Sequence, residues 1–172
     1  MSFELSIHTR FYSRAFKAIG LVVEKIKTEG PVGILGTSVG GLHASIAVSR
    51  YQEITKAFII TGGAHIPSII ANSNQKIMNK AWTERQKKYG FKNKDEYIKA
   101  LEDVIQLEPL SIKGKKLGLV IATEDETVPT INQEKLRSLW NPEIVITRNN
   151  DHFWAIVNTW LFHADEVYSF FE

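Results

Sequence analysis

The spacing of hydrophobic positions changes near residue 9. Residues 2–8 alternate between polar and apolar side chains, which predicts a short strand. From Thr9 onward, apolar residues recur at steps of three and four, which predicts an amphipathic helix that ends before Gly30 and Pro31. The apolar positions of this helix are Phe11, Ala15, Ala18, Ile19, Val22 and Ile26.

Four short apolar runs follow, and segments of helical pattern separate them. The runs cover residues 32–35, 57–61, 117–122 and 144–147. Continuous apolar runs are typical of parallel strands that helices cover on both faces. The sequence therefore predicts a three-layer α/β/α domain with a mainly parallel sheet.

The stretch from residue 64 to residue 111 interrupts this alternation. It is polar, rich in lysine, asparagine and glutamate, and has a helical pattern over residues 75–89 and 94–106. Such a long connection between two strands is typical of a helical lid or cap inserted over the carboxyl end of a sheet. A plain pair of crossover helices is the alternative.

Two helix starts have the spacing of a capping box. In this motif an N-cap side chain and a side chain three residues later satisfy the free N–H groups of the first turn. Thr130 with Gln133 fits the pattern, and Asn93 with Glu96 is a weaker version of it.

Composition favours one globular domain that spans residues 1–172, since about 150 residues is an ordinary domain length. Lysine and arginine total 21 against 19 acidic residues, and a net charge of +2 gives no support to nucleic-acid binding. The absence of cysteine excludes disulfides and thiolate catalysis. The five histidines lack metal-ligand spacing. We therefore expect neither a metal nor another cofactor.

The sequence shows no secretory signal and no membrane span. Charged residues such as Glu4 and Arg10 occupy the start of the chain, where a signal peptide would have an apolar region. The apolar runs are far shorter than the ~20 residues that cross a bilayer. A cytoplasmic protein without a membrane partner is therefore expected.

The strongest chemical signal is the sequence Gly36-Thr37-Ser38-Val39-Gly40, directly after the first apolar run. A G-x-S-x-G motif between a strand and a helix is what a nucleophile elbow requires. Gly36 and Gly40 leave room for the sharp turn, and the backbone N–H of Val39 is a candidate oxyanion donor. A phosphate-binding loop is disfavoured because no lysine follows the glycines. A tight turn without chemistry is the remaining alternative.

A serine nucleophile needs a base, which an acid orients in turn. His152 follows the last apolar run, so it is expected at the same edge of the sheet as Ser38. His65 also lies near a strand end and is a candidate for the lining of the substrate pocket. The other histidines have no comparable signal: His8, His43 and His163.

Asp125 is the best candidate for the acid, since it follows the third apolar run and precedes a turn with a proline. A carboxylate in such a turn can be held rigidly and directed at an imidazole N–H. Glu124 and Glu126 are alternatives because they flank it. Asp151 is less suitable, since a residue does not easily orient the ring of its immediate neighbour. A turn-forming aspartate without chemistry is also possible.

The order Ser38, Asp125, His152, with D-x-x-V-P from Asp125 to Pro129, resembles the α/β-hydrolase superfamily, and in particular esterase-type serine hydrolases. The resemblance extends from about Arg10 to the C-terminus. It implies a truncated α/β-hydrolase fold that lacks the N-terminal strands. It also implies cleavage of a small acyl ester or thioester through an acyl-enzyme intermediate, with these three residues as a catalytic triad.

The chain departs from this family ahead of the elbow. The family has several strands there, and a loop between them supplies a second oxyanion N–H, often next to a His-Gly pair that this chain lacks. One hypothesis pairs strand 2–8 with the elbow strand, so that the turn at His8 and Thr9 supplies a donor. In the other, the edge stays open and a second copy associates with it, as a homodimer or larger assembly. A catalytically silent module for binding or assembly is the alternative function.

Overall fold

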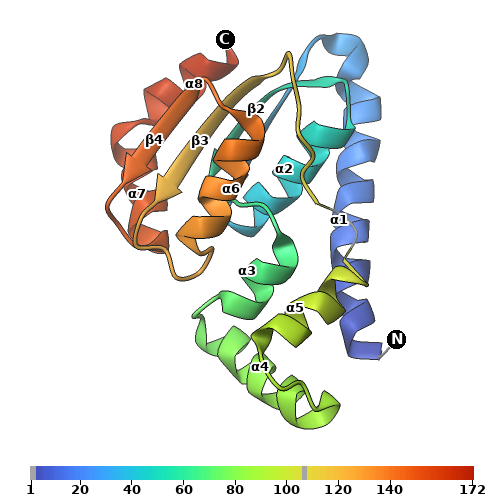
Figure 1. Cartoon of the computed structure of the whole chain (residues 1–172). Coiled ribbons are helices and arrows are strands. Elements are labelled where there is room, and N and C mark those ends of the chain that lie inside the picture. Colours follow the sequence, from blue (N-terminus) through green and yellow to red (C-terminus); the bar gives the residue numbers. More distant parts are fainter. Residues whose placement is uncertain (1–2, 106–107) are drawn as a thin grey trace.

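The computed structural model describes residues 3–105 and 108–172, apart from the side chains of residues 3–9 and 77 (Figure 1). Its helices and strands follow in this order: α1 (Phe3–Ile26), the 3₁₀ helix η1 (Lys27–Glu29), β1 (Val32–Thr37), α2 (Val39–Arg50), β2 (Ile54–Ile60), α3 (Ile66–Asn72), α4 (Lys76–Tyr89), α5 (Lys94–Glu102), β3 (Lys116–Ala122), α6 (Thr130–Trp140), β4 (Ile144–Arg148), α7 (His152–Phe162) and α8 (Ala164–Phe171).

The four strands form one parallel sheet in the order β1-β2-β3-β4. In the register, Ala57 of β2 lies between Ile34 of β1 and Leu117 of β3. Because all strands run the same way, the segments that follow them begin at one edge of the sheet. The predicted three-layer α/β fold with a parallel sheet is confirmed.

Side chains of successive strand residues point to opposite faces of the sheet, so each face has its own core. On one face, Ala57 and Leu119 pack with residues of α1, α2 and α6. On the other, Phe58 and Val120 pack with α7 and α8 (Figure 1). Gly118 is required by this second core, since a Cβ atom there would lie 2.6 Å or less from two carbons of the Phe58 ring. Strands buried on both faces explain the uninterrupted apolar runs.

The strand predicted over residues 2–8 is wrong, because α1 begins at Phe3 and continues to Ile26. Alternation over seven residues is a weak signal, and a helix of this length satisfies its own backbone and packs against α2. Tyr12 and Val23 of α1 are buried by this packing. Among the described residues, β1 therefore pairs only with β2, and the hypothetical donor turn at His8 and Thr9 does not form. Residue 2 lies outside the described residues.

Helices α3, α4 and α5 occupy the connection between β2 and β3 and extend beyond the end of the sheet (Figure 1). They pack through a separate apolar cluster, in which Ile66, Tyr97 and Leu101 join Tyr12 of α1 and Leu42 of α2. The two helices predicted in this stretch are present as α4 and α5. Helix α5 ends at residue 102. The predicted end at residue 106 lies outside the described residues. Helix α3 was not predicted.

Candidate active site

Ser38 lies in the strained turn between β1 and α2. Its φ is +54° and its ψ is −122°, a conformation that L-amino acids rarely adopt and that costs about 1–3 kcal/mol. Two backbone hydrogen bonds hold it: its N–H donates to Ile60 O at 2.9 Å, and its carbonyl accepts from Leu42 N–H at 3.1 Å. The turn thus holds the serine side chain at the carboxyl end of the sheet, at the start of α2.

The structure brings together the three side chains that the sequence suggests as nucleophile, base and acid. His152 Nε2 lies 2.7 Å from Ser38 Oγ, and His152 Nδ1 lies 2.7 Å from Asp125 Oδ2. Because a carboxylate only accepts, Nδ1 carries the ring proton and donates it to Asp125. Nε2 is then the acceptor for the serine hydroxyl. The three groups form a continuous hydrogen-bonded chain, with Asp125 buried and His152 partly exposed.

Asp125 is fixed by its own turn at the end of β3. Its Oδ1 accepts the backbone N–H of Thr127 at 2.8 Å and that of Val128 at 2.9 Å. This turn leaves Oδ2 directed toward the imidazole of His152. The carboxylate is thus held rigidly, as the proline-containing sequence led us to expect.

The competing carboxylates are occupied elsewhere or exposed. Glu126 Oε2 accepts from Asn74 Nδ2 at 2.6 Å, and Glu124 is exposed. Asp151 caps α7, because its Oδ1 accepts the N–H of Trp154 at 2.9 Å. This cap places His152 as the first residue of α7. The structure therefore joins Asp125, and not its neighbours, to the histidine.

The capping box predicted at Thr130 and Gln133 is not formed. Pro129 is the N-cap of α6, and Thr130 Oγ1 donates to the carbonyl of Ala122. The Gln133 side chain instead contacts Asp125, and nothing in the sequence indicates this contact. The other box is formed in part: Asn93 Oδ1 accepts the N–H of Glu96, whereas Glu96 Oε2 accepts the N–H of Lys92 instead of that of Asn93.

Val39 is the first residue of α2, where N–H groups have no acceptor within the helix. Its N–H therefore remains the candidate oxyanion donor. Gly36 and Gly40 flank the turn differently. A Cβ on Gly36 would lie 2.6 Å from the carbonyl oxygen of Gly40 and from the Ala44 Cβ, whereas one on Gly40 would meet nothing within 4 Å.

His65 follows β2 and adopts a left-handed conformation at the N-cap of α3. Its Nε2 lies 2.7 Å from Glu102 Oε1, and its backbone N–H donates to Glu108 Oε2 at 2.8 Å. Burial raises the pKa of Glu108, and the N–H groups of His65 and Ile66 partly offset this. His65 thus joins α3 to the end of the inserted segment, and contact with a substrate remains a prediction.

His43 lies on α2, away from the hydrogen-bonded chain. Its Nδ1 is 2.8 Å from the carbonyl of Val39, and its ring packs against Phe11 and Tyr12. Burial lowers the pKa of His43. The ring therefore belongs to the contact between α1 and α2.

Within residues 3–105 and 108–172, no three metal-binding side chains lie close enough together to hold an ion. No helix in the same part of the chain is long and apolar enough to cross a membrane.

Comparison with known proteins identifies the fold through solved structures alone, since no family model and no curated protein matches the chain. An acylaminoacyl peptidase from Pyrococcus horikoshii matches with a TM-score of 0.60 and 17% identity, over 83% of this chain and 24% of the peptidase. A hydrolase from Pseudomonas aeruginosa matches with a TM-score of 0.54 and 12% identity, over 93% of this chain and 71% of the hydrolase. An α/β-fold hydrolase from Bacillus anthracis matches with a TM-score of 0.53 and 15% identity, over 92% of this chain and 72% of the hydrolase.

These similarities show an α/β-hydrolase-like fold of which this chain spans only part. It covers about a quarter of the peptidase and 71–72% of the two hydrolases. The truncated α/β-hydrolase fold inferred from the sequence is thereby confirmed.

Proposed function

We propose that the protein is a serine hydrolase of the carboxylesterase type, which cleaves a small-molecule acyl ester or thioester. The observation that supports this most is the hydrogen-bonded chain from Asp125 through His152 to Ser38, with both contacts at 2.7 Å. In this chain a carboxylate orients a histidine, and the histidine faces a serine hydroxyl in a strained turn. A purely structural role would not require this arrangement.

In the proposed reaction, Ser38 Oγ attacks the carbonyl carbon of the substrate while His152 Nε2 takes the hydroxyl proton. Asp125 stabilises the imidazolium, and the N–H of Val39 donates to the oxygen that becomes negative. Collapse of the tetrahedral intermediate transfers the proton from His152 to the departing alcohol or thiol and leaves an acyl group on Ser38. Water, deprotonated by His152, then releases the acid.

The substrate pocket is proposed to lie beneath the segment 64–111, which would act as a lid. This segment begins at the same edge of the sheet as the three catalytic candidates, because β2 and the other strands are parallel. His65, at the start of α3, would line the substrate pocket beneath this segment.

A fluorophosphonate probe tests the proposal, because such probes phosphonylate an activated serine. Wild-type protein is expected to be labelled, and Ser38→Ala is expected to abolish labelling. Ser45→Ala is the matched control: Ser45 is a buried serine of α2, the helix that follows Ser38, and its hydroxyl donates to the Leu42 carbonyl at 2.8 Å. Label that persists in folded Ser38→Ala, or a folded wild type that stays unlabelled, would contradict the proposed chemistry.

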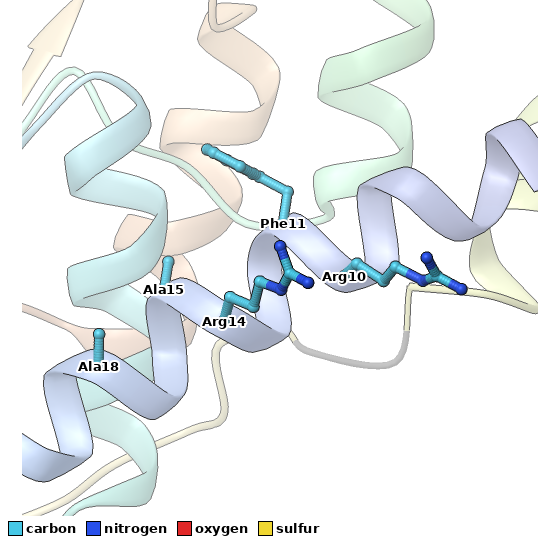
Figure 2. A pocket seen from close by; sticks show the side chains of 5 residues that line it. All are labelled: Arg10, Phe11, Arg14, Ala15 and Ala18. Carbon is cyan, nitrogen blue, oxygen red and sulfur yellow. The ribbon is translucent and has the colours of Figure 1, made fainter.

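The open edge of β1 supports a second proposal, self-association or assembly. Leu35 of β1 is 39% exposed, and an apolar groove lies between Ile34 of this strand and Val22 of α1. The apolar surface continues along α1, where Phe11 and Ala15 lie beside charged side chains (Figure 2). Edges without charged residues favour pairing with another strand. We propose that a second copy joins here to give a homodimer.

Sedimentation measures this association. The wild type is expected to form a dimer at micromolar concentration, and Leu35→Lys is expected to weaken dimerisation, because pairing would bury a charge beside the other strand. Ile131→Lys serves as the control, since Ile131 of α6 is 77% exposed and lies away from β1. A wild type that is monomeric at all micromolar concentrations would exclude the homodimer.

A further inference from the structure

Gln133 is a buried amide that contacts the acid of the proposed triad. It lies in the first turns of α6 and is completely inaccessible to solvent. Its Nε2 donates to Asp125 Oδ2 at 2.8 Å and to the carbonyl of Val128 at 2.8 Å. Its Oε1 accepts the backbone N–H of Ala122 at 3.0 Å. Both N–H bonds of the amide are therefore used.

These partners determine which way the amide faces. If its oxygen and nitrogen were exchanged, the NH₂ group would face the N–H of Ala122, and the oxygen would face the carboxylate of Asp125. Both contacts would be repulsive. The end of β3 thus fixes Gln133 as a donor toward Asp125.

Asp125 Oδ2 is the atom that Gln133 shares with the histidine. It accepts one hydrogen bond from Gln133 Nε2 at 2.8 Å and another from His152 Nδ1 at 2.7 Å. The backbone of the turn holds the other oxygen. Removal of the glutamine would leave Oδ2 with the histidine as its single donor, so this oxygen would be less firmly held than Oδ1.

We propose that Gln133 is a positioning residue that acts on the reaction through Asp125, an inference that rests on the proposed hydrolase function. As a neutral donor it orients Oδ2 and withdraws part of its charge, and it does not form an ion pair with it. Asp125 is thereby kept in the orientation in which it stabilises the imidazolium of His152 as it forms during the reaction. A cationic side chain at this position would instead compete with His152 for the carboxylate.

The acidic side chains next to Asp125 and His152 in the sequence do not contact this pair. Glu126 binds Asn74, Glu124 is exposed, and the carboxylate of Asp151 caps α7. Among the described residues, the side chains hydrogen-bonded to the Asp125 carboxylate are therefore those of Gln133 and His152. Changes at position 133 should act on this pair directly.

Two variants separate positioning from a structural role. Gln133→Met removes the donor, so kcat for a p-nitrophenyl acetate probe is expected to fall about 10²-fold with KM little changed. The rise of kcat with pH should also move to higher pH. Without the Gln133 donor, the charge on Asp125 Oδ2 acts more strongly on His152 and favours its protonated form.

Gln133→Glu keeps the shape of the side chain. If the methionine variant does not fold, this variant still distinguishes a positioning role of Gln133 from a purely structural one. A protonated glutamate still donates to Asp125, whereas an ionised one places two carboxylates together and strengthens the hold on the imidazole proton. Its kcat is therefore expected to be near that of the wild type at low pH and to fall as the pH rises, which gives a bell-shaped profile.

Thr159→Val is the matched control, because Thr159 is equally buried and its hydroxyl bonds only within α7, to the Ala155 carbonyl at 2.7 Å. Its kcat and pH profile should equal those of the wild type. Folded Gln133 variants that share the kcat and pH profile of a labelled, active wild type would overturn the role of Gln133 and leave the proposed function standing. An unlabelled, inactive wild type would instead overturn both.

Discussion

Replacement of Asp125 by asparagine is expected to lower kcat for ester hydrolysis about 10⁴-fold while the fold is kept. The asparagine oxygen can still accept the N–H groups of Thr127 and Val128, which hold the turn. Its NH₂ group would then face two donors, Gln133 Nε2 and His152 Nδ1.

The part of this conflict that involves His152 is relieved when the ring proton moves to Nε2. The imidazole then accepts at Nδ1 and presents a donor to Ser38, so it can no longer take the serine proton. Gln133 cannot relieve the conflict by rotation, since its oxygen is needed at the N–H of Ala122. The loss should therefore appear in kcat and in the rate of fluorophosphonate labelling.

Glu124→Gln and Glu126→Gln are the controls for this variant, because these neighbours were the competing acids in the sequence. Each is expected to leave kcat within about twofold of the wild type, since exposed charges are well screened. Unfolding by urea checks that Asp125→Asn is folded. If folded Asp125→Asn hydrolyses esters at the wild-type rate, Asp125 is not the acid of the site.

A second large effect is expected at Gly36, where alanine should destabilise the protein by about 3 kcal/mol. The added Cβ would lie 2.6 Å from the Gly40 carbonyl oxygen and 2.8 Å from the Gly41 Cα, and backbone atoms cannot move aside as a flexible side chain can. Helix α2 would have to shift away from β1. For a domain of this size the melting temperature should fall by about 10 °C.

Gly40→Ala provides the comparison within the same motif. Nothing lies within 4 Å of the added Cβ, and position 40 is inside α2, where alanine is favoured over glycine by up to about 1 kcal/mol. Its melting temperature should therefore equal or exceed that of the wild type. Equal destabilisation by both substitutions would show that the contact between β1 and α2 is looser than the structure indicates.

The sheet and the three central side chains could be predicted because each depends on a short-range pattern. Ser38, Asp125 and His152 each follow an apolar run, and parallel strands bring the segments after such runs to one edge. Spacing within each segment was therefore enough to suggest where the residues would meet. No knowledge of distant contacts was needed.

The contacts that the sequence did not reveal join residues far apart or compete with a local motif. His65 meets residues 37 and 43 positions later, and nothing in its neighbourhood indicates this. Gln133 has the spacing of a capping residue, but a buried carboxylate is a stronger partner for its amide than the start of a helix is. The alternation in residues 2–8 was too short to outweigh the helix that follows it.

The backbone at Ser38 has one more consequence. With φ at +54°, glycine would fit this position with less strain than serine does. The proposed nucleophile thus stands at a position where folding alone would favour glycine. If Ser38 has the proposed role, Ser38→Gly should keep the fold with equal or higher resistance to heat and yet abolish hydrolysis.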